Sequence, residues 1–253
     1  MGLGRRTVSP EQAERWIYNR MADAYSARPA YPAALIEHVL QLLTLTPAAV
    51  VDIGAGIGHL SVPLAKAGHH VHAVEPAQLM LGALAARAAA ERVQLELVHA
   101  AAEELPLPAA SADLLLVADA VHFLAAKRAG QEFDRVLRRP GVLAFVQVEF
   151  GASRFMQALA QLMREAAPRR PKAVSGVMTE IAALCGITLA LQTSLESVCE
   201  VDGAQLETIL RSISFIGPAM SAARFDAFRE RVQAIVEPPV WHTTLHLYAG
   251  RRK

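Results

Sequence analysis

The segment that most constrains the fold of this chain is VVDIGAGIGHL, which spans residues 50–60. An apolar run ends at Asp52 and leads into a turn with glycines at alternate positions, 54, 56 and 58, before the helix-like residues 60–67. Glycine tolerates positive φ and lets a ligand lie against the main chain. A helix that begins there also presents unpaired N–H groups. The segment therefore predicts a strand–turn–helix unit that binds a nucleotide-like cofactor.

The spacing of these glycines separates three kinds of nucleotide site. A dinucleotide fold requires G-x-G-x-x-G/A, but the third small position is occupied by His59. A phosphate-binding P-loop requires Gly-Lys-Ser/Thr, which the sequence lacks. The remaining pattern, D-x-G-x-G-x-G after a strand, resembles the first motif of the class I S-adenosylmethionine-dependent methyltransferases. This resemblance implies that the cofactor contacts Asp52, Gly54, Ala55, Gly56 and Gly58.

A second acidic residue follows at the distance that a nucleoside requires. The β-branched run HVHAVE ends at Glu75, 17 positions after Gly58. A carboxylate at the end of the second strand of a βαβ unit can accept both ribose hydroxyls. Alternatively, Glu75 caps the helix that begins near Pro76, and the two roles are compatible. The string VEPAQLML resembles the second motif of the same family, which implies that Glu75 and Pro76 contact the cofactor.

The region from residue 93 to residue 150 extends the resemblance. Many relatives have an adenine-binding Asp where this chain has Ala101, so the backbone of Ala102 and the side chain of Glu103 are the remaining candidates. The apolar strand 114–118 ends at Ala118, a further implied contact. RVLRRPGVLAFVQVEF, residues 135–150, matches the family's helix, turn and fifth strand. The resemblance covers about residues 16–150.

The N-terminal segment YNRMADAYSARPAYP, residues 18–32, resembles the tyrosine-rich segment that precedes the first motif in small-molecule members of this family. It implies that Tyr25, Arg28 and Tyr31 surround the methionine end of the cofactor, with the guanidinium facing the carboxylate. In the alternative interpretation, the two tyrosines simply anchor two helices on the sheet.

The order of periodic segments predicts the architecture. Helical periodicity is expected at 10–28 and 32–43, and βα alternation then runs from 49 to 149. Helices at 154–166 and 177–185 precede a β-rich run at 187–200, helices at 202–213 and 221–236, and a final strand at 240–251. We therefore predict one α/β domain over residues 1–253. The resemblance further implies that its Rossmann-like, mainly parallel sheet has seven strands with the last one antiparallel, helices on both faces and a helical cap.

The cap is expected to combine residues 1–45 with a long insertion, 201–239, between the last two strands. Long insertions of this kind are more often functional than decorative. Its residues Phe215, Ile216 and Met220 are expected to be exposed and to face Tyr25 and Tyr31, so that they select the acceptor. The alternative is that the insertion only covers the edge of the sheet.

Two residues are candidates for catalysis. Methyl transfer from a sulfonium is a direct displacement, and a base is needed only if the nucleophile carries a proton. His122 follows the fourth strand, at the sheet edge where open α/β sheets place their sites, and it could serve as a general base, a wall of the site or a structural residue. Asp119 is the second candidate.

Composition limits the partners. The 25 basic and 24 acidic residues give no electrostatic footprint for nucleic acid. Two cysteines cannot build a disulfide framework or a metal site, and no apolar run reaches the roughly 18–20 residues that span a bilayer. We expect a cytoplasmic protein that binds neither nucleic acid nor membrane nor metal. A homodimer is one assembly that the sequence allows.

The predicted function is transfer of a methyl group from S-adenosylmethionine to an N, O or C atom of a small organic acceptor, a class that includes secondary metabolites. Two alternatives remain. One is an enzyme of the same fold that binds the cofactor but catalyses a cyclisation or an elimination. The other is a non-catalytic scaffold that retains the cofactor site.

Overall fold

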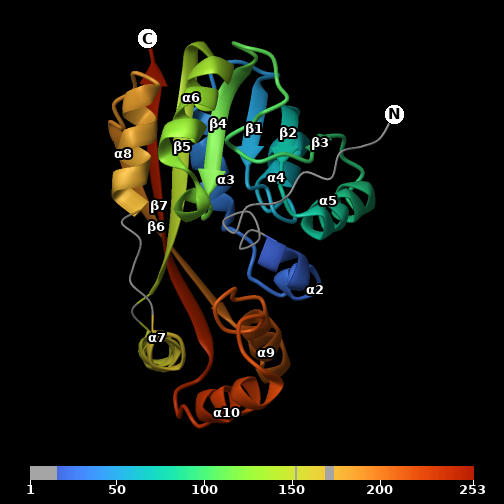
Figure 1. The fold of residues 1–253 in the computed structure, drawn as a ribbon, viewed down its shortest axis with the longest axis vertical. Coiled ribbons are helices and arrows are strands. Elements are labelled where there is room, and N and C mark those ends of the chain that lie inside the picture. The colour runs from blue at the N-terminus through green and yellow to red at the C-terminus, as the bar shows by residue number, and fades with distance from the viewer. Residues whose placement is uncertain (1–15, 152, 169–173) are drawn as a thin grey trace.

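The computed structural model describes residues 16–151, 153–168 and 174–253. In this part of the chain the strands form one seven-stranded sheet in the order β3-β2-β1-β4-β5-β7-β6 (Figure 1). The strands are β1 (Ala49–Ile53), β2 (His70–Val74), β3 (Glu96–Val98), β4 (Ala112–Ala118), β5 (Leu137–Phe150), β6 (Leu191–Glu200) and β7 (Val240–Arg252). The pairings among β1 to β5 are parallel, and β7 runs antiparallel to both β5 and β6. The predicted sheet is confirmed.

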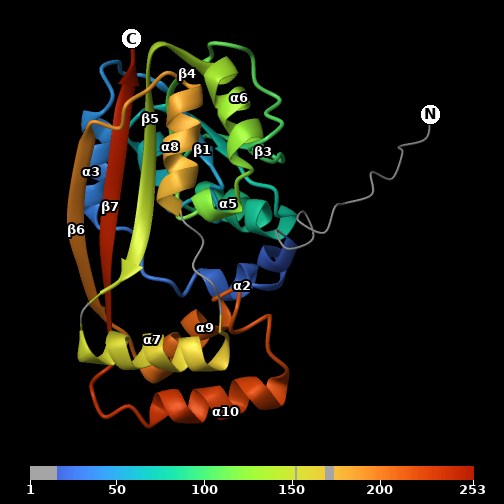
Figure 2. The same cartoon turned by 60° about the vertical axis from the view of Figure 1, so that its left-hand side comes forward.

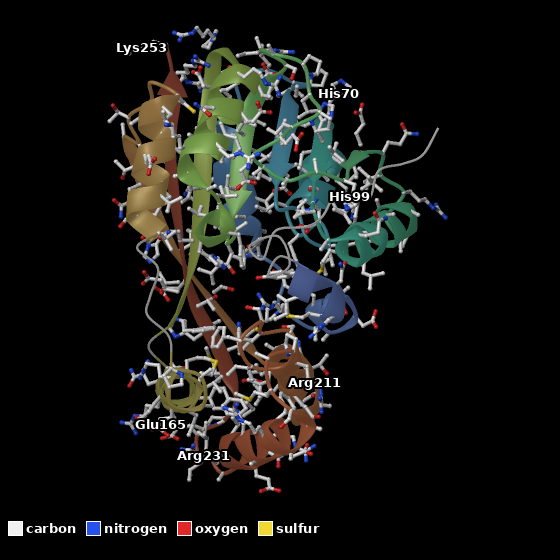
Figure 3. The ribbon with its side chains drawn as sticks, viewed as in Figure 1. His70, His99, Glu165, Arg211, Arg231 and Lys253 are labelled. Atoms are coloured by element: carbon white, nitrogen blue, oxygen red, sulfur yellow. The ribbon has the colours of Figure 1, made fainter. Side chains whose placement is uncertain are left out.

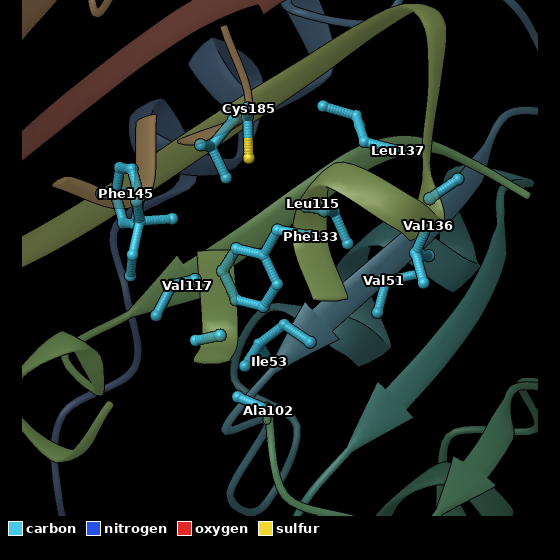
Figure 4. Packing of buried hydrophobic residues seen from close by; sticks show 14 of the residues in the cluster. Val51, Ile53, Ala102, Leu115, Val117, Phe133, Val136, Leu137, Phe145 and Cys185 are labelled. Carbon is cyan, nitrogen blue, oxygen red and sulfur yellow. The ribbon is translucent and has the colours of Figure 1, made fainter. Parts of the chain in front are cut away.

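Helices cover both faces of this sheet (Figure 2). On one face lie α6 (Ala126–Val136) and α8 (Val174–Leu184), and on the other lie α3 (Ala33–Gln41), α4 (Ser61–Lys66) and α5 (Gln78–Ala90). The central strands are apolar at nearly every position because both of their faces are covered. Phe133 of α6 is fully buried between the helix and the sheet, near Val117 and Leu115 of β4 (Figure 4).

A separate group of helices packs around the far ends of β5, β6 and β7 (Figures 1 and 2). It consists of α7 (Arg154–Ala166), α9 (Gly203–Arg211) and α10 (Ala222–Gln233). From here on, the helical cap means these three helices with the residues that connect α9 to α10, and it does not include the N-terminal segment of the predicted cap. The cap has a hydrophobic cluster of its own, and an ion pair of 2.6 Å between Glu165 and Arg231 joins α7 to α10 on its surface (Figure 3). The predicted helices at 202–213 and 221–236 are confirmed, but α7 was not predicted to pack with them.

The N-terminal segment departs from the predicted helix at 10–28. Residues 10–15 lie outside the described part, and the rest forms a 3₁₀ helix, η1 (Trp16–Arg20), and a short α2 (Ala22–Tyr25). The chain turns at Met21, whose side chain is buried against Ile57 and Met80. Tertiary packing therefore overrides the helical periodicity here. It places α2 between α5 and the α9 helix of the cap.

A further short 3₁₀ helix, η2 (Val121–Phe123), follows β4 at the edge of the sheet where the glycine turn lies. None of the helices in the described ranges is long and apolar enough to cross a membrane.

Candidate active site

The glycine turn after β1 is fixed to the end of β2. The backbone N–H groups of Gly54 and Ala55 both donate to the carbonyl oxygen of Val74, at 2.8 and 3.0 Å. Gly56 has φ +56°, and a Cβ at this position would point toward the ring of Tyr25, 3.9 Å away. A side chain here would be strained and would enter the space between the turn and Tyr25.

Glu75 closes the turn from the other side. Its Oε2 accepts a hydrogen bond from the N–H of Gly56 at 2.9 Å, and its Oε1 accepts one from the N–H of Ala77 at 2.8 Å. The carboxylate is buried, and burial raises its pKa while the two backbone bonds lower it. Each carboxylate oxygen has a second acceptor position. Glu75 therefore fixes the residue before α5, whose N-cap is Ala77 with no side-chain cap, and keeps acceptor capacity toward the neighbouring cavity.

A cavity runs along the turn and the ends of β1, β2 and β4. Its walls include most of the predicted cofactor contacts, namely Tyr25, Gly54, Gly56, Glu75, Pro76, Ala102 and Ala118, together with Asp119. A turn whose glycines face a buried carboxylate and a small, apolar far wall fits a nucleoside that carries no phosphate. The residues present therefore fit S-adenosylmethionine.

Four of the predicted cofactor contacts between residues 50 and 150 do not line this cavity, and each makes other contacts in the structure. Asp52 is buried, and its Oδ2 accepts a hydrogen bond of 2.5 Å from the hydroxyl of Ser61, which joins β1 to α4. A Cβ at Gly58 would lie 3.0 Å from Cγ of Leu84, so this glycine allows the turn to pack on α5. Ala55 is buried with the same leucine, and Glu103 accepts a hydrogen bond from the N–H of Ala125 at 2.9 Å.

Asp119 occupies the turn that follows β4. It has φ +48°, a left-handed conformation that few residues other than glycine, Asn and Asp adopt, and its N–H donates to the carbonyl of Val146 at 2.8 Å. Burial raises the pKa of its carboxyl group to about 6, and the nearby Arg28 partly opposes this rise. Backbone strain of this kind concentrates at functional sites. The carboxyl group therefore lines the cavity with a pKa close to neutral pH.

A second, larger cavity of about 840 Å³ lies between the sheet and the cap. It shares Tyr18, Tyr25, Asp119 and Phe123 with the walls of the first cavity. Much of its lining is aromatic or aliphatic and comes from α7, β5, β7 and the segment after α9, including Phe150, Met163, Ile213, Phe215, Trp241 and Leu245. The N-terminal segment, the glycine turn and η2 contribute most of the remainder, which includes Arg28, Tyr31, His59 and His122. The two cavities therefore meet at Asp119 and the aromatic residues beside it.

The predicted exposure of the cap residues needs correction. Ile216 is completely buried in the hydrophobic cluster of the cap, and Met220 packs partly buried against the same cluster. Of the three predicted residues, Phe215 alone lines the larger cavity. The segment after α9 forms a helix-like turn, since the N–H of Met220 donates to the carbonyl of Ile216 at 3.1 Å, and it contributes Ile213, Ile216 and Met220 to the hydrophobic cluster of the cap.

Arg28 and three tyrosines form a cluster at the junction. The guanidinium of Arg28 lies over the ring of Tyr25, 4.3 Å from its centroid, and lines the larger cavity with Tyr31. Burial lowers the pKa of Arg28, but its neighbours, Asp119 and the tyrosines, together raise it above the ordinary value, so the group remains charged. Burial raises the pKa of Tyr18, Tyr25 and Tyr31 above the ordinary value, so these phenols stay protonated and can donate hydrogen bonds.

Two histidines face the larger cavity. His122 packs against Phe123, with the ring centroids 3.9 Å apart. His59 lies edge-on to Tyr31, at a centroid distance of 5.9 Å, and both of its ring nitrogens are buried without a hydrogen-bond partner among the described residues. Burial lowers the pKa of His59 to about 4, so its ring is neutral at physiological pH.

Several residues at the junction of the two cavities were not predicted from the sequence to belong to the site. Sequence reasoning gave no role to Tyr18 or Phe123, and it used His59 only to exclude a dinucleotide fold. Tyr18 begins the tyrosine-rich segment, which could have identified it. His59 sits in the glycine turn, but no spacing rule predicts that its side chain faces a cavity formed by α7 and β7.

Comparisons with known proteins agree with this geometry. Residues 51–145 match a family model described as a methyltransferase domain. An uncharacterized methyltransferase of Mycobacterium tuberculosis is 42% identical over 122 residues, which are 47% of this chain and 46% of that protein. The chain thus matches about half the length of this curated relative.

Solved structures share the fold over nearly the whole chain. Geranyl diphosphate C-methyltransferase from Streptomyces coelicolor, solved with S-adenosyl-L-homocysteine, has a TM-score of 0.60 and 12% identity, with 98% of this chain and 100% of that chain covered. The [4+2]-cyclase SpnF has a TM-score of 0.62 and 14% identity, with 97% of each chain covered. At this level of identity the likeness concerns the fold.

The chain therefore carries a class I methyltransferase domain, and S-adenosylmethionine is the cofactor of that domain. The family, enzyme class and cofactor predicted from the motifs between residues 50 and 150 are confirmed.

Proposed function

We propose that this protein transfers the methyl group of S-adenosylmethionine to an N, O or C atom of a small, largely apolar organic acceptor held between the sheet and the cap. The observation that carries the proposal is the junction of two cavities at Tyr18, Tyr25, Asp119 and Phe123. One cavity has the glycine turn and carboxylate of a nucleoside site. The other has the size and aromatic lining of a small-molecule site.

The residues of the first cavity have distinct tasks. Glu75 accepts the ribose hydroxyls, Gly56 leaves room for the ligand against the main chain, and Ala102 forms the small wall on the adenine side. Arg28 lines the larger cavity, and from there, stacked beside Tyr25, it offers its guanidinium to the carboxylate at the methionine end. The bound cofactor supplies an electrophilic methyl group on a positively charged sulfur.

The residues at the junction orient the acceptor and exclude water. Alignment of this kind contributes on the order of 7–11 kcal/mol to catalysis. Asp119 is ionised at pH 7, since its pKa is about 6, and its carboxylate can take a proton from an attacking hydroxyl or amine. Of the two candidate bases, Asp119 lines both cavities, whereas His122 lines the larger one and serves there as a wall or a second base.

The proposal is tested with S-adenosylmethionine carrying a ¹³C-methyl group and an extract of small molecules from the source cell. We expect a labelled, organic-soluble product whose mass exceeds that of its precursor by the labelled methyl, together with stoichiometric S-adenosylhomocysteine. Turnover of a precursor without label would instead identify a cyclase or an eliminating enzyme. Tight cofactor binding with no turnover of any fraction would favour the scaffold.

A further inference from the structure

Ser212 connects the cap to the N-terminal segment through one arginine. It follows α9 and is completely buried. Its hydroxyl donates to the carbonyl of Ile209 at 2.6 Å and accepts a hydrogen bond from Nε of Arg28 at 2.9 Å. Its carbonyl oxygen accepts a second bond from Nη2 of the same arginine at 2.7 Å. Two of the three guanidinium nitrogens are therefore bound to a single residue of the cap.

The third nitrogen is held much less firmly. Nη1 of Arg28 makes a long contact of 3.4 Å with the hydroxyl of Tyr25, and the guanidinium carbon lies over the ring of that tyrosine, 4.3 Å from its centroid. A guanidinium is a rigid, planar fork, so fixing two of its nitrogens fixes the direction of the third. Ser212 therefore determines where Nη1 points.

The same tyrosine faces the cofactor turn. The ring of Tyr25 lies 3.9 Å from the position of a Cβ on Gly56, and it lines both cavities. Gly56, Tyr25, Arg28 and Ser212 thus form a continuous series of contacts from the glycine turn to the cap. A cofactor that lies along the turn would direct its methionine end to this cluster.

We propose that Ser212 is a positioning residue for the cofactor: by binding Nε and Nη2 of Arg28, it aims Nη1 at the carboxylate of the methionine end. The inference rests on the proposed function and deepens it, because it makes a residue of the cap contribute to affinity for the cofactor as well as to enclosure of the acceptor. Occupancy of the cofactor site and docking of the cap on α2 should then favour each other.

Two ligands separate this role from a structural one. S-adenosylhomocysteine carries the amino-acid carboxylate, whereas 5′-methylthioadenosine has the same nucleoside and sulfur without it. Titration calorimetry of the full chain with each ligand gives a ratio of dissociation constants that reports on the amino-acid end of the ligand, the carboxylate and the ammonium group together. For Ser212→Ala we expect S-adenosylhomocysteine to bind about 5- to 10-fold more weakly, and 5′-methylthioadenosine to bind within about 2-fold of the wild type.

A double-mutant cycle with Arg28→Lys tests whether Ser212 acts through the arginine. Lysine keeps the charge but has no fork for Ser212 to hold. The Ser212→Ala change should therefore have no further effect on the ratio in the Arg28→Lys background. Ser212→Thr, which keeps the hydroxyl, should retain the wild-type ratio. Ser212→Gly removes the same hydroxyl and replaces the alanine variant if that variant does not fold.

Two variants in α9 serve as matched controls. Gln205→Ala removes the other bond between α9 and the N-terminal segment, the 3.2 Å contact of Nε2 with the carbonyl of Ala27. Thr208→Ala removes a hydroxyl that bonds within the helix to Ala204. Neither variant touches Arg28, so both should leave the ratio unchanged.

The outcomes distinguish the inference from the function on which it rests. The inference is overturned if Ser212→Ala weakens both ligands equally or neither, if its effect persists in the Arg28→Lys background, or if Gln205→Ala changes the ratio as much. A wild-type protein that binds neither ligand would overturn the proposed function itself. Binding of both ligands with an unchanged ratio in Ser212→Ala would leave the cofactor site intact and refute only the role of Ser212.

Discussion

Removing the carboxylate of Glu75 is the most direct test of the cofactor site, because that group has two separable tasks. It accepts hydrogen bonds from the N–H groups of Gly56 and Ala77 at 2.9 and 2.8 Å, and it faces the cavity with its remaining acceptor positions. A hydrogen bond to a charged group contributes roughly 1.5–3 kcal/mol net of its exchange with water, and in the variant water that replaces the carboxylate recovers part of the loss. We expect Glu75→Ala to weaken S-adenosylhomocysteine by about 2–3 kcal/mol, or roughly 30- to 150-fold.

The same substitution should reduce stability. It leaves the buried N–H of Ala77 without its partner, which costs about 1–3 kcal/mol of stability. Removing the carboxylate offsets part of this cost, because burial of that group is itself unfavourable, as its raised pKa shows. Glu75→Gln should bind the ligand no better than Glu75→Ala does. The glutamine NH₂ group is a donor, and it would have to face another donor, the N–H of either Gly56 or Ala77. Glu96→Ala is the matched control, since that glutamate is exposed on β3 and should change stability by less than about 0.5 kcal/mol.

Calorimetric titration measures the affinity, and urea unfolding measures the stability. In the wild type the affinity should also fall as the pH is lowered through the raised pKa of Glu75, because the protonated group loses acceptor capacity, and Glu75→Ala should lack this dependence. A folded Glu75→Ala protein that binds S-adenosylhomocysteine within about 3-fold of the wild type would refute the assignment of the ribose site.

Three further predictions concern other parts of the site. The wild type should increasingly prefer the cationic S-adenosylmethionine over S-adenosylhomocysteine as the pH rises through about 6, because Asp119 ionises, and calorimetry on Asp119→Asn should find a preference independent of pH. Burial raises the pKa of Asp52 from 3.8 to about 6, so its contribution to stability is present below pH 3.8 and is lost as the pH rises through about 6. Relative to the wild type, Asp52→Asn should therefore gain up to about 3 kcal/mol in urea unfolding between pH 4 and pH 7.5. Ile216→Ala should cost about 2–5 kcal/mol of stability because Ile216 fills the cap's core, whereas Phe215→Ala at the cavity wall should cost less; an equal loss in both would mean that Phe215 is core as well.

The sequence predicted best where function requires a particular backbone. The turn after β1 has glycines at all three predicted positions with positive φ, and Glu75 ends the second strand as the spacing indicated. These are local properties: a strand, a tight turn and an acid at a fixed separation. The parallel part of the sheet followed from the order of βα units, since right-handed crossovers leave few alternatives, and the antiparallel last strand followed from the resemblance to the family. Local rules gave no sign that the missing side chain at Gly58 also allows packing on Leu84.

The remaining features depend on contacts between distant segments. Arg28 and Ser212 are 184 positions apart, and no periodicity in either segment indicates that they meet. The amphipathic pattern of α7 predicted a helix but not its partner, which is the cluster built by α9 and α10. The cofactor half of the site can be predicted from short sequence motifs, because it is built from consecutive strand ends and turns. The larger cavity, the proposed acceptor half, is lined mainly by segments that are far apart in the chain: the N-terminal residues, β5, α7, the insertion before β7 and β7 itself. We therefore expect that acceptor specificity can change through substitutions that leave every cofactor motif intact, and Met163, Phe215 and Trp241 are the residues on which to test this.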